Sequence, residues 1–125
     1  MSKLLVCGSR KLHGVDFTKH LLPICNDYDV DVIITGGAVG VDRDASNWAS
    51  RWLIKTETVK PDYAEYGRQA PVIRDKQMVD MCDACVAFWD GFSRGTEHTI
   101  NFAKESNKPY VVFICNDSGK VVNVG

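Results

Sequence analysis

The apolar run at residues 85–89 is followed at once by an acid and then by glycines and hydroxyl residues, whose loop could bind an anion. They are Asp90, Gly91, Ser93, Gly95 and Thr96. A strand, a glycine-rich turn and a helix together present free backbone N–H groups and a positive helix end. Gly91 and Gly95 permit the positive φ angles and close backbone approach that such a loop needs. Ser93 and Thr96 suit a phosphate as hydroxyl donors and are equally ordinary N-cap residues. By itself the segment fits either a phosphate loop or a tight turn.

Two earlier apolar runs, residues 3–7 and 31–35, are also followed by glycine-containing turns. The residues concerned are Gly8, Ser9, Arg10, Gly36 and Gly37. Short apolar runs bounded by glycine are typical of buried parallel strands, whose carboxyl ends meet at one edge of a sheet. Ligands of such sheets bind at that edge, so three turns there indicate a phosphate- or nucleotide-type site. The predicted ligand-binding residues are Gly8, Ser9, Arg10, Gly36, Gly37, Asp42, Arg74, Asp90, Gly91, Ser93, Gly95 and Thr96.

Four charged residues of this set have two interpretations each. Arg10 and Arg74 can hold a phosphate through the planar guanidinium or lie in solvent. We expect Arg74 to lie on the ligand-facing edge, outside the core. Asp42 can cap the helix that follows its turn or accept a hydrogen bond from a ribose hydroxyl. Asp90 can bind a ribose or a base edge, or tie down its own loop.

Alternating apolar runs and amphipathic segments predict an α/β fold. Strands are expected at residues 3–7, 31–35, 56–59, 84–89 and 110–115, and helices at 17–24, 41–53, 71–81 and 96–106. Residues 62–69 are polar and are expected to form a surface loop, and a turn at 117–120 leads into a last strand at 121–124. The prediction is one domain over residues 1–125, a Rossmann-like open, mostly parallel five-stranded sheet with flanking helices and a small C-terminal antiparallel strand.

The composition excludes several classes of protein. A hydrophobic content of 45% and a charged content of 25% are typical of a globular domain. The net charge of −1 gives no general basic surface for duplex DNA, and no apolar run approaches the length of a membrane span. The odd number of cysteines, five, favours a reducing, cytoplasmic location over a disulfide framework. The pair Cys82 and Cys85 has no second pair or histidine cluster, so no metal site is predicted.

The motifs together resemble the SLOG superfamily, the Rossmann-like group of DprA and the Lonely Guy phosphoribohydrolases. Within it, the similarity is greatest to the small single-domain YspA/YpsA-like branch. The matching pieces are residues 6–10 and 34–42, Ala45, Trp48 and Ala49, Arg74 with Met78, and residues 87–96. The resemblance implies a pocket for a nucleotide or a nucleotide-derived ligand, and a tendency to form homo-oligomers.

One motif of the Lonely Guy enzymes is incomplete in this chain. Those enzymes release a base from a nucleoside monophosphate, using an arginine followed four positions later by a methionine and a PGGxGTxxE loop. Arg74 and Met78 match the first element, and Gly95 and Thr96 match the GT of the second. Thr99 stands where the resemblance places the catalytic glutamate. An oxocarbenium-like transition state needs a nearby carboxylate, so the expectation moves from hydrolysis towards binding.

The leading hypothesis is therefore a binding module for a nucleotide or nucleotide-derived small molecule, without a cofactor. The first alternative is a nucleoside-monophosphate N-glycosidic hydrolase that works with Arg74 and an unconventional carboxylate, Asp90 or Glu97. The second alternative is single-stranded nucleic-acid binding, for which no basic stripe is visible. Neither nucleic acid nor a membrane is the expected partner. A homo-oligomer is expected, because apolar residues of the segment 72–81 need cover.

Overall fold

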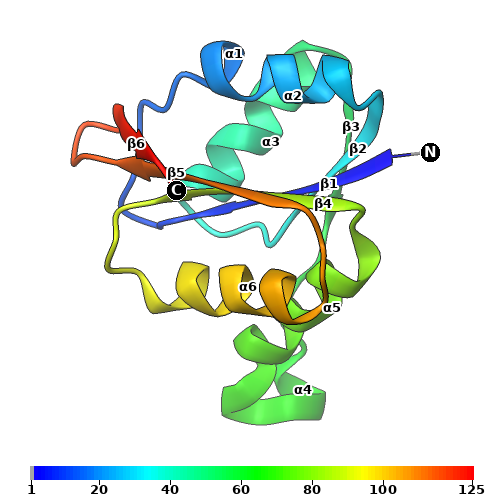
Figure 1. Ribbon diagram of the computed structural model, residues 1–125. Coiled ribbons are helices and arrows are strands. Elements are labelled where there is room, and N and C mark those ends of the chain that lie inside the picture. The colour runs from blue at the N-terminus through cyan, green and yellow to red at the C-terminus, as the bar shows by residue number, and fades with distance from the viewer. Residues whose placement is uncertain (1) are drawn as a thin grey trace.

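A computed structural model describes residues 2–125. Its centre is a six-stranded sheet in the order β3-β2-β1-β4-β5-β6 (Figure 1). The strands are β1 (Ser2–Gly8), β2 (Val30–Thr35), β3 (Lys55–Thr58), β4 (Ala84–Trp89), β5 (Tyr110–Cys115) and β6 (Val121–Val124). The first five are parallel, and β6 pairs antiparallel with β5. The predicted Rossmann-like sheet with a small antiparallel strand is confirmed.

Helices cover both faces of the sheet (Figure 1). On one face lie α1 (Phe17–His20), α2 (Leu22–Asp27) and α3 (Val41–Arg51). On the other lie α5 (Ala70–Met81) and α6 (Arg94–Glu105), with α4 (Tyr63–Tyr66) and the 3₁₀ turn η1 (Gly67–Gln69) beyond them. Among residues 2–125, no helix has the length and apolar content to cross a bilayer.

The alternation of side chains along β1 explains the two layers. Leu4 and Val6 pack into the core beneath α1–α3, whereas Leu5 and Cys7 pack into the core beneath α5 and α6. Successive residues of a strand point to opposite faces, so a strand buried on both faces has to be apolar throughout. All five cysteines are buried free thiols, as small core residues would be.

The structure corrects three expectations about the helices. The helix predicted at residues 17–24 is two short helices, since Pro23 cannot donate the backbone hydrogen bond that would join them. Residues 62–69, predicted to be a loop, form α4 and η1; Asp62 caps α4 by accepting from Glu65 N at 3.1 Å. This segment buries no side chain, so its sequence carries no apolar period to indicate a helix.

The third correction concerns the glycine-rich loop after β4. Helix α6 begins at Arg94, two residues earlier than predicted, so Gly95 and Thr96 belong to its first turn. Gly91 has the expected positive φ, 86°, but Gly95 has none and is an ordinary helical residue. The loop is therefore shorter than the sequence suggested, and the start of α6 lies closer to the strand end.

The central strands β1 and β4 approach each other and α3 closely at Gly8. Gly8 pairs with Phe88 across the two strands. A Cβ added at Gly8 would lie 2.5 Å from the Cβ of Val41 and 2.6 Å from the carbonyl oxygen of Phe88. The absence of a side chain at residue 8 thus allows α3 to start directly against the end of β1. Between β1 and β4 the order of the strands also reverses, which is where sheets of this kind bind ligands.

Replacing Gly8 with alanine should therefore destabilise the fold. We expect Gly8→Ala to lower the free energy of unfolding by about 1–3 kcal/mol, the usual cost of overpacking, measured by urea denaturation. Gly95→Ala is the matched control, because no atom lies within 4 Å of its added Cβ. Alanine is the better helix former by about 1 kcal/mol, so this control should be neutral or stabilising. Equal losses in the two variants would contradict the close approach at Gly8.

Candidate functional site

A cavity of about 450 Å³ opens at the carboxyl ends of β1 and β4. Of the predicted site residues, Gly8, Ser9, Arg10, Asp42, Arg74, Asp90, Ser93, Gly95 and Thr96 line it. Gly36, Gly37, Gly91 and Glu97 are not among its lining residues. Gly36 and Gly91 follow the ends of β2 and β4, so the three predicted turns do share one edge of the sheet. Most of the predicted residues therefore lie together at the carboxyl edge of the sheet.

The loop between β4 and α6 is held by Asp90. One oxygen of its carboxylate accepts from Phe92 N at 2.8 Å and from Ser93 N at 2.9 Å. The backbone N–H of Asp90 donates to Ser9 Oγ at 3.2 Å, which joins the two central turns. Burial alone raises the pKa of Asp90, but the two backbone N–H groups outweigh it and hold the pKa below its usual value. Asp90 therefore ties down its own loop, one of the two predicted readings.

The first turn of α6 offers hydrogen-bond donors to the cavity. Ser93 is the N-cap residue, yet its side chain makes no capping hydrogen bond. Its hydroxyl lies 3.3 Å from that of Thr96 instead. The first N–H groups of a helix have no intrahelical acceptor, and the helix dipole makes this end positive. Since Ser93, Gly95 and Thr96 all line the cavity, the start of α6 is suited to an anion.

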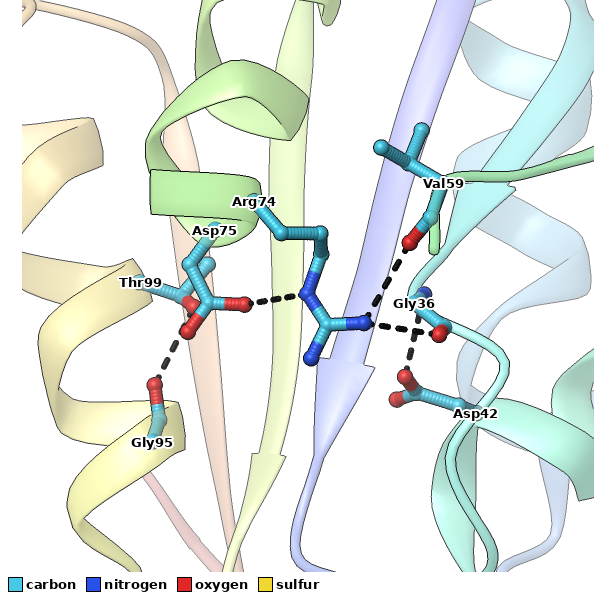
Figure 2. Close-up of polar contacts among 7 residues, drawn as sticks. All are labelled: Gly36, Asp42, Val59, Arg74, Asp75, Gly95 and Thr99. Atoms are coloured by element: carbon cyan, nitrogen blue, oxygen red, sulfur yellow. Dashed lines mark hydrogen bonds and ion pairs between the residues drawn. The ribbon is translucent and has the colours of Figure 1, made fainter. Parts of the chain in front are cut away.

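The expectation that Arg74 lies outside the core is wrong. The residue is 7% exposed, and its guanidinium joins three parts of the chain (Figure 2). Its Nη1 donates to Gly36 O at 2.8 Å and to Val59 O at 3.2 Å, and its Nε donates to Asp75 Oδ1 at 2.9 Å. Removing one partner of a buried, hydrogen-bonded ion pair usually costs about 3–5 kcal/mol. Arg74 is thus a structural residue that also lines the cavity.

Asp42 is also committed to the protein. Its Oδ2 accepts from Gly36 N at 3.0 Å and fixes the loop before α3 (Figure 2). Burial raises the pKa of Asp42 to about 6, while the N–H groups of Ala38 and Gly36 and the positive charge of Arg74 pull it down. The role of helix cap is not the one observed, because Asp42 binds the loop that precedes its helix. Its remaining contact with the cavity leaves a ligand role open.

Several residues that line the cavity were not predicted to do so. Lys11 and Asp75 are the main additions, whereas Phe92 lies in the predicted glycine-rich loop and Thr99 at the position where the resemblance places a glutamate. The spacing of Arg74, Asp75, Met78 and Val79 in the sequence puts them on one side of a helix, and in the structure all four are buried residues of α5. Two adjacent opposite charges on the face that also carries apolar residues indicate a buried ion pair. Lys11 is an exposed residue of its turn, and no local pattern marks it.

The cavity is electrostatically divided. Its buried floor carries Asp42, Asp75 and one arginine, Arg74. Its exposed edge carries Arg10 and Lys11, and the carboxylate of Asp90, which is bonded to the backbone of its own loop, lies beside the start of α6. Burial raises the pKa of Asp75, and the neighbouring Arg74 offsets part of this effect. Within residues 2–125, no three His, Cys, Asp or Glu side chains gather in a way that could hold a metal ion.

The raised pKa of Asp42 predicts a pH-dependent stability. The folded chain binds a proton at Asp42 more tightly than the unfolded chain, so the free energy of unfolding should fall as the pH rises from about 4 to about 6. Above that range it should level off. A difference of about two pKa units corresponds to on the order of 3 kcal/mol.

Asp42→Asn removes this titration and keeps an oxygen for Gly36 N. The gap in unfolding free energy between wild type and variant should therefore change over this pH range in urea titrations. Asp75 titrates in both proteins, so the gap reports the titration of Asp42 and its repulsion by Asp75. A gap that stays constant from about pH 4 to about pH 7.5 would show that Asp42 has an ordinary pKa.

No protein-family model matches the chain, and no solved structure gives a significant match. The chain is similar to the Gene 61 protein of Mycobacterium phage D29, with 33% identity over 88 residues. The match covers 66% of this chain and 70% of the phage protein. This similarity does not test the resemblance to the SLOG superfamily, which stays a prediction. At this identity and coverage, the chain belongs to the same family as the Gene 61 protein of phage D29.

Proposed function

We propose that the protein binds a nucleotide or a nucleotide-derived small molecule in the cavity at the carboxyl ends of β1 and β4. The observation that carries the proposal is the position of this cavity. It lies where the strand order reverses, and the turns after both central strands and the uncapped start of α6 line it. Open α/β sheets bind phosphate-bearing ligands at this point, where helix N-termini and turn N–H groups converge.

The phosphate is proposed to lie between the start of α6 and the exposed edge of the cavity. Ser93 and Thr96 supply hydroxyls there, and Arg10 and Lys11 supply positive charge. A volume of about 450 Å³ is within the range of small-molecule sites. Phe92 is 87% exposed and lines the same cavity, so its ring is available to stack on a base.

The positions of the two carboxylates named for hydrolysis, Asp90 and Glu97, favour binding. The hydrolase alternative relied on Asp90 or Glu97 to support the transition state. Glu97 does not line the cavity, and Asp90 is bound to the backbone of its own loop. The proposal therefore assigns recognition and no reaction. Incubation with nucleoside monophosphates, followed by chromatography for free base, tests this part; base release above the uncatalysed background would reinstate the hydrolase.

Arg10→Ala should weaken binding without affecting the fold. The residue is exposed, and loss of one charge-assisted hydrogen bond to a phosphate lowers affinity about tenfold. Thermal shift with mononucleotides, ADP-ribose and cyclic dinucleotides identifies a ligand, and isothermal titration then compares the variants. Arg51→Ala is the matched control. Arg51 is exposed at the far end of α3, and its substitution removes the same charge.

Two results would contradict the proposal. The first is the absence of any thermal shift across the nucleotide panel. The second is an equal loss of affinity in Arg10→Ala and Arg51→Ala, which would mean that overall charge, and not the cavity, attracts the ligand.

We also propose that the protein forms homo-oligomers. Of the apolar residues in 72–81 that were expected to need cover, Met78 and Val79 are in the core, and Val72 and Met81 are each 38% exposed. Two valines of the edge strand β6, Val122 and Val124, are about 60% exposed. Exposed valines on an edge strand are suited to pairing with another chain.

Sedimentation at micromolar concentration should accordingly show a species heavier than the 13.9 kDa chain. Val122→Lys should shift the distribution towards the single chain, because a charge on an edge strand opposes pairing. A wild-type protein that sediments only as the 13.9 kDa species would overturn this proposal.

A further inference from the structure

The carboxylate of Asp75 can accept more hydrogen bonds than its neighbours in the protein supply, because each of its two oxygens has two lone pairs. Its Oδ1 accepts from Arg74 Nε at 2.9 Å. On the other side of the carboxylate lies the hydroxyl of Thr99, which donates to Gly95 O at 3.1 Å and also helps to lower the pKa of Asp75 (Figure 2). Within residues 2–125, no fully buried side-chain oxygen or nitrogen lacks a partner. Asp75 lines the cavity, so its carboxylate can accept one further hydrogen bond from a ligand there.

The neighbouring arginine also has an uncommitted group. Nη1 and Nε of Arg74 are bonded to Gly36, Val59 and Asp75. Figure 2 shows Nη2 pointing away from these three partners, with no interaction drawn to it. Arg74 thus has a free donor, and both Arg74 and Asp75 line the cavity. Both side chains are nine-tenths buried, so their orientation is fixed by packing.

The charge of the floor determines which end of a ligand fits there. Two carboxylates and one guanidinium sum to −1 when all are ionised. A phosphate on the floor would be within reach of both carboxylates, and like charges at short distance in a buried site repel strongly. At the edge of the cavity, by contrast, Arg10, Lys11 and the start of α6 attract it. The floor therefore suits an uncharged group that carries hydrogen-bond donors.

We propose that Asp75 determines ligand specificity by accepting a hydrogen bond from the uncharged end of the nucleotide, either a sugar hydroxyl or a base N–H. The proposal rests on the proposed function. It assigns the ligand an orientation, with the phosphate at the cavity edge and the donor-bearing group on the floor. It also replaces the expectation that Arg74 holds the phosphate.

Asp75→Asn tests this orientation by the sign of its effect. The amide oxygen remains for Arg74 Nε, so the NH₂ group faces the cavity and presents a donor where the ligand needs an acceptor. We expect AMP and GMP to bind about tenfold more weakly, their nucleosides to lose the same factor, and inorganic phosphate to be unchanged. Asp80→Asn is the control; Asp80 is an exposed carboxylate of α5, paired with Lys76. Thermal melts verify that both variants fold.

Further ligands separate the two sources of the donor. If ribose 5-phosphate also loses affinity in Asp75→Asn, the donor is a sugar hydroxyl; if only the complete nucleotides do, it is a base N–H. Should the variant not fold, wild-type protein gives the answer. Among 2′,3′-dideoxy and base-N-methylated monophosphates, at least one should bind about tenfold more weakly than its parent.

Three outcomes are distinct from one another. Tighter binding of AMP, GMP and phosphate by Asp75→Asn would place the phosphate on the floor beside Arg74 and overturn the inference alone. Unchanged affinity for all ligands, or full affinity for every dideoxy and methylated analogue, would also overturn it. If the wild-type protein binds none of these nucleotides, nucleosides or phosphates, the proposed function fails, and the inference fails with it.

Discussion

The candidate site depends on the buried guanidinium of Arg74. It joins α5 to the loop after β2 through Gly36 O and to the residue after β3 through Val59 O. Within α5 it also donates to its neighbour Asp75 (Figure 2). Two of these partners are backbone carbonyls that directly follow or lie next to strand ends, Gly36 O and Val59 O. The guanidinium is a suitable donor, because its planar fork reaches several acceptors at once and never loses its charge. The wall formed by α5 is thereby held at a fixed distance from the edge of the sheet.

Close backbone packing sets the other wall. Gly8 lets α3 begin against the ends of β1 and β4, and Asp90 N donates to Ser9 Oγ across the two central turns. The carboxylate of Asp90 then holds the backbone of Phe92 and Ser93. As a result, the first turn of α6 starts beside the strand ends with its N–H groups directed to the cavity. Most polar side chains around the cavity thus fix its shape, and few remain for a ligand.

Acidic and basic groups lie at different depths in the cavity. Acidic groups lie on the floor, where burial raises the pKa of Asp42 and of Asp75, and basic groups lie at the solvent-exposed edge. Exposed charges attract a ligand and are screened by salt, whereas buried charges select by hydrogen bonding. Such an arrangement suits a ligand with one anionic end and one neutral polar end, as nucleotides have. The membership in a family with a phage protein does not bear on this argument.

The sequence by itself determined the sheet and the edge at which the site lies. Apolar runs that end in glycine predicted the parallel strands, because a strand buried on both faces must be apolar throughout. The parallel arrangement then brought the turns at Gly8, Gly36 and Gly91 to one edge. Only the tertiary structure decided what the charged residues do. Arg74 was expected to lie outside the core and is buried, although it lines the cavity, and Asp75, absent from the prediction, lines the cavity too. Local spacing specifies which face of a helix a side chain occupies. It does not specify which carbonyl of a distant loop, 15 or 38 residues away, arrives to meet that side chain.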